Sequence, residues 1–358
     1  MACETRCRAD ALLGSCKIHV TRSEYHQLPH SHTFSSVAQR ERLLMFCIVG
    51  LGLCDEKDIT LRGLEAVKSA SRVYLEAYTS ILMIEKARLE SFYGKEVIVA
   101  DRDMVESEDG SNEILKNADK EDVCLLVVGD PFGATTHTDI LIRARQLGIP
   151  TRVIHNASIM NAVGASGLQL YNFGQTVSLV FFTETWKPDS FYDRIKENID
   201  GGLHTLVLLD IKSDSFFFRG RKVYEPPRYM TVPQAVSQLL EIENMRREGV
   251  LDPDKTLAIS MGRVGGFDQQ RILAGPLCSL LRAFPEDFGP PLHSLIIVGK
   301  RLHHLEVEYG ELFAEDLGEA IAVAEEDGRN PELGQQGRKG GRELWRKVAH
   351  EAYGVALS

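Results

Sequence analysis

Short apolar runs alternate along the chain with segments of helical apolar spacing, from residue 45 onward. Phe46–Val49 is apolar and ends at a glycine, which is typical of a buried strand. Residues 60–69 then place apolar side chains at helical spacing. The run Val123–Val128 (VCLLVV) is continuous and apolar, and a Gly-Asp-Pro turn follows it. It therefore predicts a second buried strand.

The same criteria predict further strands and helices in alternation. We expect strands at 72–75, 97–99, 152–154, 177–182, 205–209, 257–260 and 295–298. We expect helices at 84–93, 113–118, 139–147, 190–198 and 232–247. Strands that alternate with helices imply crossover connections and mainly parallel sheets. Several strands in the second half are separated by hairpin-like spacings, which favours a mixed sheet there.

These elements predict two α/β domains, at 45–155 and 156–308, with a ligand cleft between them. Residues 1–44 lack clean periodicity, so we expect a disordered extension. A metal-binding tract, a targeting segment and a leader ahead of a start at Met45 are the alternatives. Residues 309–358 include a Gly/Gln/Arg/Lys run and predict a largely disordered tail. Short helices could form there at 320–324 and 344–348.

Composition narrows the function classes. The 358 residues carry a net charge of -10, which argues against a protein that coats nucleic acid or anionic membrane. No apolar stretch of about 18 residues is present, so we expect no membrane-spanning helix. The 7 cysteines are odd in number and form no C-x-x-C pair. This is typical of a reduced intracellular protein, and we expect no metal site.

The loops that follow the predicted strands contain the candidate chemistry, because ligands of open α/β sheets bind beyond the carboxyl ends of strands. Gly50-Leu51-Gly52 lacks the third glycine of a dinucleotide fingerprint. In Gly129–Ala134 (GDPFGA), the Asp130 carboxylate could bind a ligand, or it could only shape its own turn. His155–Met160 places a helix start after a strand, with Asn156 or Ser158 as the cap.

Residues 209–210, 262–266 and 291–293 are further loops of this kind, and none of them is diagnostic alone. The sequence contains no Walker loop, no H-E-x-x-H and no G-x-S-x-G. The pattern by itself therefore predicts a two-domain α/β protein with a polar ligand in its cleft.

Longer strings narrow this prediction through resemblance to known families. Gly50–Gly52 with 58–64 (DITLRGL), and 128–134 (VGDPFGA), resemble the two signatures of the tetrapyrrole methylase superfamily. Other strings resemble the eukaryotic diphthine methyl ester synthase family. They are YLEAYTS at 74–80, HNASIMNAVG at 155–164, GLQLY at 167–171, YEPPRYM at 224–230 and LHSLI at 292–296. The resemblance runs in order from Met45 to about Gly299.

This resemblance implies a class III methyltransferase with S-adenosylmethionine as the methyl donor. The implied substrate is translation elongation factor 2, on which one histidine bears an aminocarboxypropyl arm. Eukaryotic members methylate the amine of that arm three times and its carboxylate once, which supplies an intermediate of diphthamide. The resemblance also implies a cytoplasmic homodimer.

The donor site carries over by position onto eight residues. They are Leu53, Asp130, Gly133, Ser158, Ile159, Leu209, Val264 and His293. Most would act through backbone groups and shape, with Asp130 and His293 as the polar exceptions. A sulfonium methyl is already activated, so in-line geometry and desolvation matter more than acid–base chemistry. We assign no catalytic base; a structural hydrogen bond is the preferred interpretation of His293.

Three departures from the family and two alternatives remain at this point. Residues 1–44 are extra, the 210–220 segment is short and contains Phe216–Phe218, and Gly262 stands where the family has alanine. The alternatives are a methyltransferase of the same superfamily that acts on a tetrapyrrole or another small molecule, and a non-catalytic scaffold that binds the donor. A nicotinamide dehydrogenase is disfavoured by the incomplete fingerprint.

Overall fold

The structure is a computed structural model that describes residues 44–78, 81–106, 113–212, 215–218, 221–224, 226–317 and 340–356. Leu43–Ser358 forms one compact unit. The extension predicted at 1–44 lies outside the described residues, apart from its last position. No helix within the described ranges is long and apolar enough to cross a membrane.

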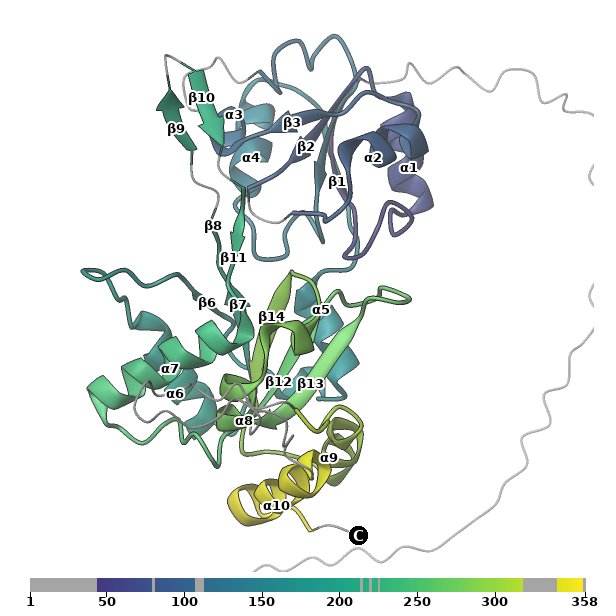
Figure 1. The fold of residues 1–358 in the computed structure, drawn as a ribbon. Helices are drawn as coiled ribbons and strands as arrows, with labels where there is room; N and C mark the ends of the chain where they lie inside the picture. Colours follow the sequence, from purple (N-terminus) through teal and green to yellow (C-terminus); the bar gives the residue numbers. More distant parts are fainter. Residues whose placement is uncertain are drawn as a thin grey trace, which may run out of the picture. The chain divides into compact units, whose positions relative to one another are not determined.

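The first sheet has five strands, all parallel, in the order β3-β2-β4-β1-β5 (Figure 1). They are β1 (Phe46–Gly50), β2 (Arg72–Glu76), β3 (Ile98–Ala100), β4 (Val123–Val127) and β5 (Thr151–Ile154). Every residue of β1 and β4 is buried, because these two strands lie inside the sheet and both of its faces are covered. This explains why their sequences are continuously apolar rather than alternating.

Helices cover both faces of this sheet. They are α1 (Leu61–Ser69), α2 (Lys86–Tyr93), α3 (Arg102–Glu106) and α4 (Thr138–Gln146). One buried cluster joins one face to α1 and α2, and another joins the opposite face to α3 and α4. The helix predicted at 113–118 is wrong: residues 113–120 are turns, and Asn117 adopts a φ of 60°. The structure instead has α3, which the apolar pattern did not indicate.

The second sheet is mixed, as the hairpin-like spacings predict, with the order β13-β12-β14-β7-β6. Its strands are β6 (Val177–Leu179), β7 (Thr205–Leu209), β12 (Leu257–Gly262), β13 (Arg271–Pro276) and β14 (His293–Ile297). Only β6 and β7 pair in parallel, and the other three pairings are antiparallel.

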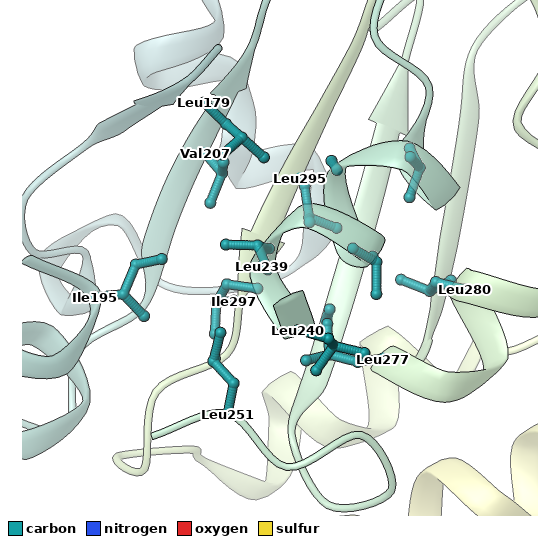
Figure 2. Close-up of a cluster of buried hydrophobic side chains, with 14 of the residues drawn as sticks. Leu179, Ile195, Val207, Leu239, Leu240, Leu251, Leu277, Leu280, Leu295 and Ile297 are labelled. Carbon is teal, nitrogen blue, oxygen red and sulfur yellow. The ribbon is translucent and has the colours of Figure 1, made fainter. Parts of the chain in front are cut away.

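One face of the second sheet packs against α6 (Ser190–Asp200), α7 (Val232–Arg246) and α8 (Leu277–Arg282). Figure 2 shows side chains of β6, β7 and β14 meeting those of these helices in one apolar core. The start of α7 is fixed by its sequence: the Thr231 hydroxyl accepts a hydrogen bond from Gln234 N–H, and the Gln234 side chain accepts one from Thr231 N–H.

The opposite face packs against a group of shorter elements and the last helix. They are α5 (Ile159–Ala162), α9 (His304–Glu311), α10 (Gly341–Tyr353) and the 3-10 turn η1 (Val163–Ser166). A second 3-10 turn, η2 (Leu170–Asn172), follows η1 along the chain and has no buried residue. A third turn, η3 (Pro285–Phe288), precedes β14. Near the start of α9, the buried Glu306 carboxylate lies 3.4 Å from Nε2 of buried His204 and accepts a hydrogen bond from Gln169 N–H.

The structure differs from the expectation of a largely disordered tail after residue 309. Trp345 of α10 is fully buried, and its indole N–H donates to the Val307 carbonyl at 3.0 Å. The Asp316 carboxylate accepts hydrogen bonds from the N–H groups of Gly340 and Gly341, both at 2.9 Å. Asp316, which follows α9, is therefore joined by hydrogen bonds to the residues at the start of α10. The helix predicted at 320–324 lies outside the described residues.

Two short ribbons connect β7 to α7 (Figure 1). The strands β8 (Ile211–Lys212) and β11 (Arg228–Tyr229) pair antiparallel, and β9 (Ser215–Phe218) pairs with β10 (Arg221–Tyr224). The segment that the sequence presents as a short loop with three phenylalanines thus contributes strands to two antiparallel pairs.

Candidate functional site

A cavity lies where the loops after β1, β4 and β5 meet the ends of β7, β12 and β14. The empty space within the cavity and in the open solvent at its mouth totals about 1030 Å³. Its walls are mainly aliphatic, with a few polar groups among them, which is typical of a site for a small organic ligand. The lining residues include Leu53, Gly133, Ser158, Ile159, Leu209, Asp210, Tyr229, Met230, Met261, Val264, Leu292 and His293.

The structure brings seven of the eight predicted donor-site residues to this one cavity. They are Leu53, Gly133, Ser158, Ile159, Leu209, Val264 and His293. These residues are spread over 241 positions of sequence (53 to 293 inclusive), and they come from six different loops or strand ends. Asp130 is not among the lining residues, although its neighbour Gly129 is.

The loops after β1 and β4 are joined directly through two glycines. Gly52 N–H donates to the Gly129 carbonyl at 3.2 Å, and Gly129 N–H donates to the Gly52 carbonyl at 2.7 Å. Both have positive φ, 80° and 77°. The Asp58 carboxylate then accepts hydrogen bonds from Leu53 and Cys54 N–H, at 3.2 and 2.8 Å. These contacts fix the backbone at Leu53, where the chain meets the cavity.

Gly133 permits a close approach between the loop after β4 and the start of α5. A Cβ at position 133 would lie 2.8 Å from both Cβ and Oγ of Ser158. Ser158 is the cap residue of α5, and its N–H donates to the Asn161 side chain at 2.9 Å. Of the two caps that the sequence allows, Asn156 and Ser158, the structure has Ser158.

Asp130 holds two loops together with its carboxylate. Oδ1 accepts a hydrogen bond from Phe132 N–H at 2.9 Å; Oδ2 accepts one from Asn156 N–H at 3.0 Å and lies 2.9 Å from His155 Nδ1. Burial alone would raise the pKa of Asp130, but these hydrogen bonds outweigh it and hold the pKa below its ordinary value. Asp130 therefore shapes its own turn, and its contact with the donor stays a prediction.

The second sheet closes the cavity through the end of β7 and the loop after β12. The Asp210 carboxylate, next to Leu209, accepts a hydrogen bond from Phe181 N–H at 3.1 Å. Arg263 is buried, and its guanidinium donates to the Cys54 carbonyl at 3.1 Å. This hydrogen bond joins the two loops that contain Val264 and Leu53.

His293 begins β14 and presents one unpaired ring nitrogen. Nε2 lies 3.1 and 3.0 Å from the carbonyls of Phe288 and Gly289, so it must carry the hydrogen. Nδ1 is therefore an acceptor, and it is buried without a partner. Burial lowers the pKa of His293, against the carbonyls that would raise it, so the ring is neutral near pH 7.

Sequence reasoning missed several cavity residues. Tyr229 and Met230 belong to the string YEPPRYM, which indicated the family. Nothing in that string indicated that these two side chains line the cavity. Leu292 likewise belongs to the string LHSLI, whereas Met261, three positions before Val264, lies in none of the quoted strings. Among the described residues, no three His, Cys, Asp or Glu side chains are grouped so that they could hold a metal ion.

Comparison with known proteins defines the class. Residues 45–280 match the family model for Tetrapyrrole (Corrin/Porphyrin) Methylases. The fold class predicted from the sequence, a class III methyltransferase built of α/β units, is thereby confirmed, and so is the prediction of a methyltransferase enzyme.

Individual relatives narrow the class further. The diphthine methyl ester synthase of Emericella nidulans is 61% identical over 276 residues, covering 76% of this chain and 94% of the relative. That of Schizosaccharomyces pombe is 60% identical over 284 residues, covering 78% and 98%. The chain belongs to the diphthine methyl ester synthase family.

Solved structures agree with this assignment. A provisionally assigned diphthine synthase from Entamoeba histolytica superposes with a TM-score of 0.65 at 50% identity, covering 75% of this chain and 98% of that one. Another diphthine synthase structure superposes with a TM-score of 0.63 at 34% identity, covering 75% and 95%.

Proposed function

We propose that this enzyme transfers methyl groups from S-adenosylmethionine to the aminocarboxypropyl histidine of translation elongation factor 2. It would methylate the amine three times and the carboxylate once, within diphthamide biosynthesis. The observation that carries the proposal is the convergence of seven predicted donor-site residues on one cavity, in a chain about 60% identical to diphthine methyl ester synthases.

The cavity residues fit this donor chemically. Leu53, Ile159, Leu209 and Val264 supply aliphatic surface for a nucleoside, and His293 Nδ1 is a buried acceptor in need of a donor group. S-adenosylmethionine supplies a methyl group activated by its sulfonium sulfur. No residue of the cavity has to act as a strong acid or base to activate that methyl group.

The residues of this chain act by holding and shielding the reactants. The Gly52–Gly129 pair and the Asp130 carboxylate fix three loops of the first sheet at the cavity. The Arg263–Cys54 hydrogen bond joins the loops on its two sides. Fixed walls keep the transferable methyl group and the acceptor atom in line and exclude water, which lowers the barrier without proton transfer.

The test is to incubate the enzyme with S-adenosylmethionine and elongation factor 2 that carries the unmethylated arm. Mass spectrometry of the histidine peptide counts the methyl groups. We expect a ladder that ends at four. A ladder that ends at three would contradict methylation of the carboxylate. No methylation, with donor binding intact by calorimetry, would overturn the substrate and favour a small-molecule methyltransferase.

We further propose that the enzyme works in the cytoplasm as a homodimer, on the basis of the family resemblance. Sedimentation equilibrium of the full chain tests the assembly, and a mass of one chain at micromolar concentration would contradict it. Imaging of the tagged protein in cells tests the location.

A further inference from the structure

One wall of the cavity contains none of the eight predicted donor-site residues. It lies at the end of β7, where the paired strands β8 and β11 begin to leave the second sheet (Figure 1). Its residues, all of which line the cavity, are Asp210, Ile211, Tyr229 and Met230. We refer to these four residues as the β8–β11 wall.

The sequence of this wall points to the methyl acceptor. Tyr229 and Met230 come from the string YEPPRYM, which resembles the narrower diphthine methyl ester synthase family. The superfamily signature at 128–134 instead supplies cavity residues from the first sheet. Enzymes that share a methyl donor differ in the acceptor, so the β8–β11 wall is the better candidate for contact with the acceptor.

Asp210 is held in place within this wall by hydrogen bonds on two sides. Its N–H donates to the Leu179 carbonyl of β6 at 3.1 Å, and its carbonyl accepts a hydrogen bond from Met230 N–H at 3.0 Å. One carboxylate oxygen, Oδ2, accepts a hydrogen bond from Phe181 N–H at 3.1 Å. The carboxylate therefore has a fixed position at the cavity, as a group that acts on a bound substrate requires.

The negative charge of Asp210 has no cationic partner in the protein. Asp210 is the one carboxylate among the described residues that line the cavity, and its Oδ1 has no hydrogen bond or ion pair with a described residue. Arg263 also lines the cavity, but its guanidinium donates to the Cys54 carbonyl at 3.1 Å and to the Gln269 side chain at 3.3 Å. The charge at position 210 is thus available to a cationic ligand.

The rest of the wall favours removal of a proton from such a ligand. Met230 is buried, Ile211 is half-buried, and burial raises the pKa of the Tyr229 phenol, which stays neutral near pH 7. Apolar surroundings disfavour charges that have left water. A proton that passes from a bound cation to the carboxylate removes both charges at once, so this site suits an ammonium that has to become an amine.

The proposed reaction supplies such an ammonium. The arm on the histidine carries one near pH 7, and an ammonium nitrogen has no lone pair with which to receive a methyl group. We propose that Asp210 is a catalytic residue that binds this ammonium in the cavity and takes its proton before each amine methylation. This inference rests on the proposed function, which supplies the chemistry of the arm.

The proton passes from the nitrogen to a carboxylate oxygen of Asp210, and the freed lone pair then bonds to the methyl carbon as the sulfonium becomes a neutral thioether. The nitrogen is positive again after the transfer, and Asp210 releases its proton to water. Each amine methylation therefore releases one proton. The carboxylate of the arm differs, because its oxygen already has a lone pair and no proton, so ester formation needs no base.

The donor also carries an ammonium, so the source of the ligand has to be distinguished. The amine of the donor loses no proton in the reaction and has no need of a base. Donor affinity separates the two sources, because it depends on the charge at position 210 only if Asp210 contacts the donor.

The experiment compares Asp210→Asn with the wild-type enzyme. Asparagine keeps the shape of the side chain and can accept the hydrogen bond from Phe181 N–H, but it has no negative charge and takes up no proton. The matched control is Asp252→Asn. The Asp252 carboxylate accepts hydrogen bonds from Asp254 and Lys255 N–H at 2.9 and 3.1 Å, before the start of β12, whereas the cavity lies at the end of that strand.

Two single-turnover rates are measured by mass spectrometry of the histidine peptide. The first is the first methylation of elongation factor 2 with the unmethylated arm, and the second is ester formation on the factor whose arm already carries three methyl groups on its amine. We expect Asp210→Asn to lower the first rate about a hundredfold, as loss of a general base does, and the second by less than about threefold. Donor Kd by calorimetry should be unchanged, and Asp252→Asn should match the wild type in all three measurements.

The outcomes separate the inference from the proposed function. An equal loss in both rates would assign Asp210 a structural role and overturn the inference, and so would a first methylation at the wild-type rate. Weaker donor binding that accounts for the slower methylation would assign Asp210 to the donor and overturn it as well. If the wild type forms no ester, the proposed function loses that step, and the first rate with donor Kd still decides the inference. A wild-type enzyme that methylates neither form of the factor would overturn both together.

Discussion

The two sheets of this enzyme contribute to the same cavity in different ways. In the first sheet all strands are parallel, so every carboxyl end lies at one edge, and the loops after β1, β4 and β5 all reach the cavity from there. In the second sheet β12 and β14 are antiparallel, so the end of one lies beside the start of the other. Gly262, which ends β12, is paired in register with His293, which begins β14.

This difference limits the rule that places ligands at the carboxyl ends of strands. The rule selects Leu53, Gly133 and Ser158 in the first sheet, and Leu209 and Val264 in the second. The sequence groups residues 291–293 with these loops, but the structure places His293 at the amino end of its strand. In a mixed sheet, a binding edge includes strand starts as well as strand ends.

The largest effect that we expect is a loss of stability at the face of the second sheet that packs against α10. Replacing fully buried Trp345 with alanine removes an indole packed between α10 and the sheet, and should cost about 3–5 kcal/mol of unfolding free energy. Urea denaturation measures it. The matched control is Trp186→Ala, since Trp186 is 55% exposed and should change stability by less than about 1 kcal/mol. Equal effects would contradict a structural role for α10.

The next effect concerns the parallel sheet. Gly133→Ala adds a Cβ that would lie 2.8 Å from Ser158, so the loop after β4 or the start of α5 must move. We expect about tenfold weaker donor binding, with a stability loss of about 1–3 kcal/mol. Calorimetric titration with S-adenosylmethionine measures the affinity. Gly164→Ala is the control, because its added Cβ would meet only the Leu170 side chain at 3.8 Å. Unchanged donor affinity in Gly133→Ala would contradict this prediction, because the two loops would then accommodate the added Cβ without disturbing the cavity.

The smallest effect concerns the antiparallel edge. Gly262→Ala would place a Cβ 3.0 Å from the His293 ring and 3.2 Å from the Phe288 carbonyl, so the ring must shift slightly. The resemblance places alanine at this position in the family, so the fold can accommodate it, and we expect donor affinity to fall only about twofold to fivefold. Gly275→Ala in neighbouring β13 is the control, with its nearest contact at 3.4 Å. If both variants bind the donor equally, the ring position at 293 does not determine affinity.

Much of the fold could be predicted because burial leaves a clear signature. Strands covered on both faces, such as Phe46–Gly50 and Val123–Val127, are uniformly apolar and short. The spacing at 113–118 was misleading: Ile114, Leu115 and Ala118 are buried as a helical face would be, but they are buried by turns. Periodicity reports which side chains are covered and leaves the backbone conformation open.

The remaining differences come from contacts distant in sequence. The apolar positions of α10, including Trp345, Val348 and Ala349, follow helical spacing, yet the polar run before them favoured a tail. Their partners lie on α9, β12 and β13, which no local pattern identifies. Likewise, the Asp130 carboxylate contacts His155 and Asn156, about 25 residues further along the chain, and no local pattern identifies these contacts.

The hydrogen bonds from Gly340 and Gly341 to Asp316 have a consequence for how α10 is attached. They join the residues that follow α9 directly to the start of α10. The backbone of Gly340 and Gly341 is thus tied to Asp316 by hydrogen bonds as well as by the covalent chain between them. A cut in the backbone between these two points would leave α10 attached to the second sheet through Trp345 and through Asp316.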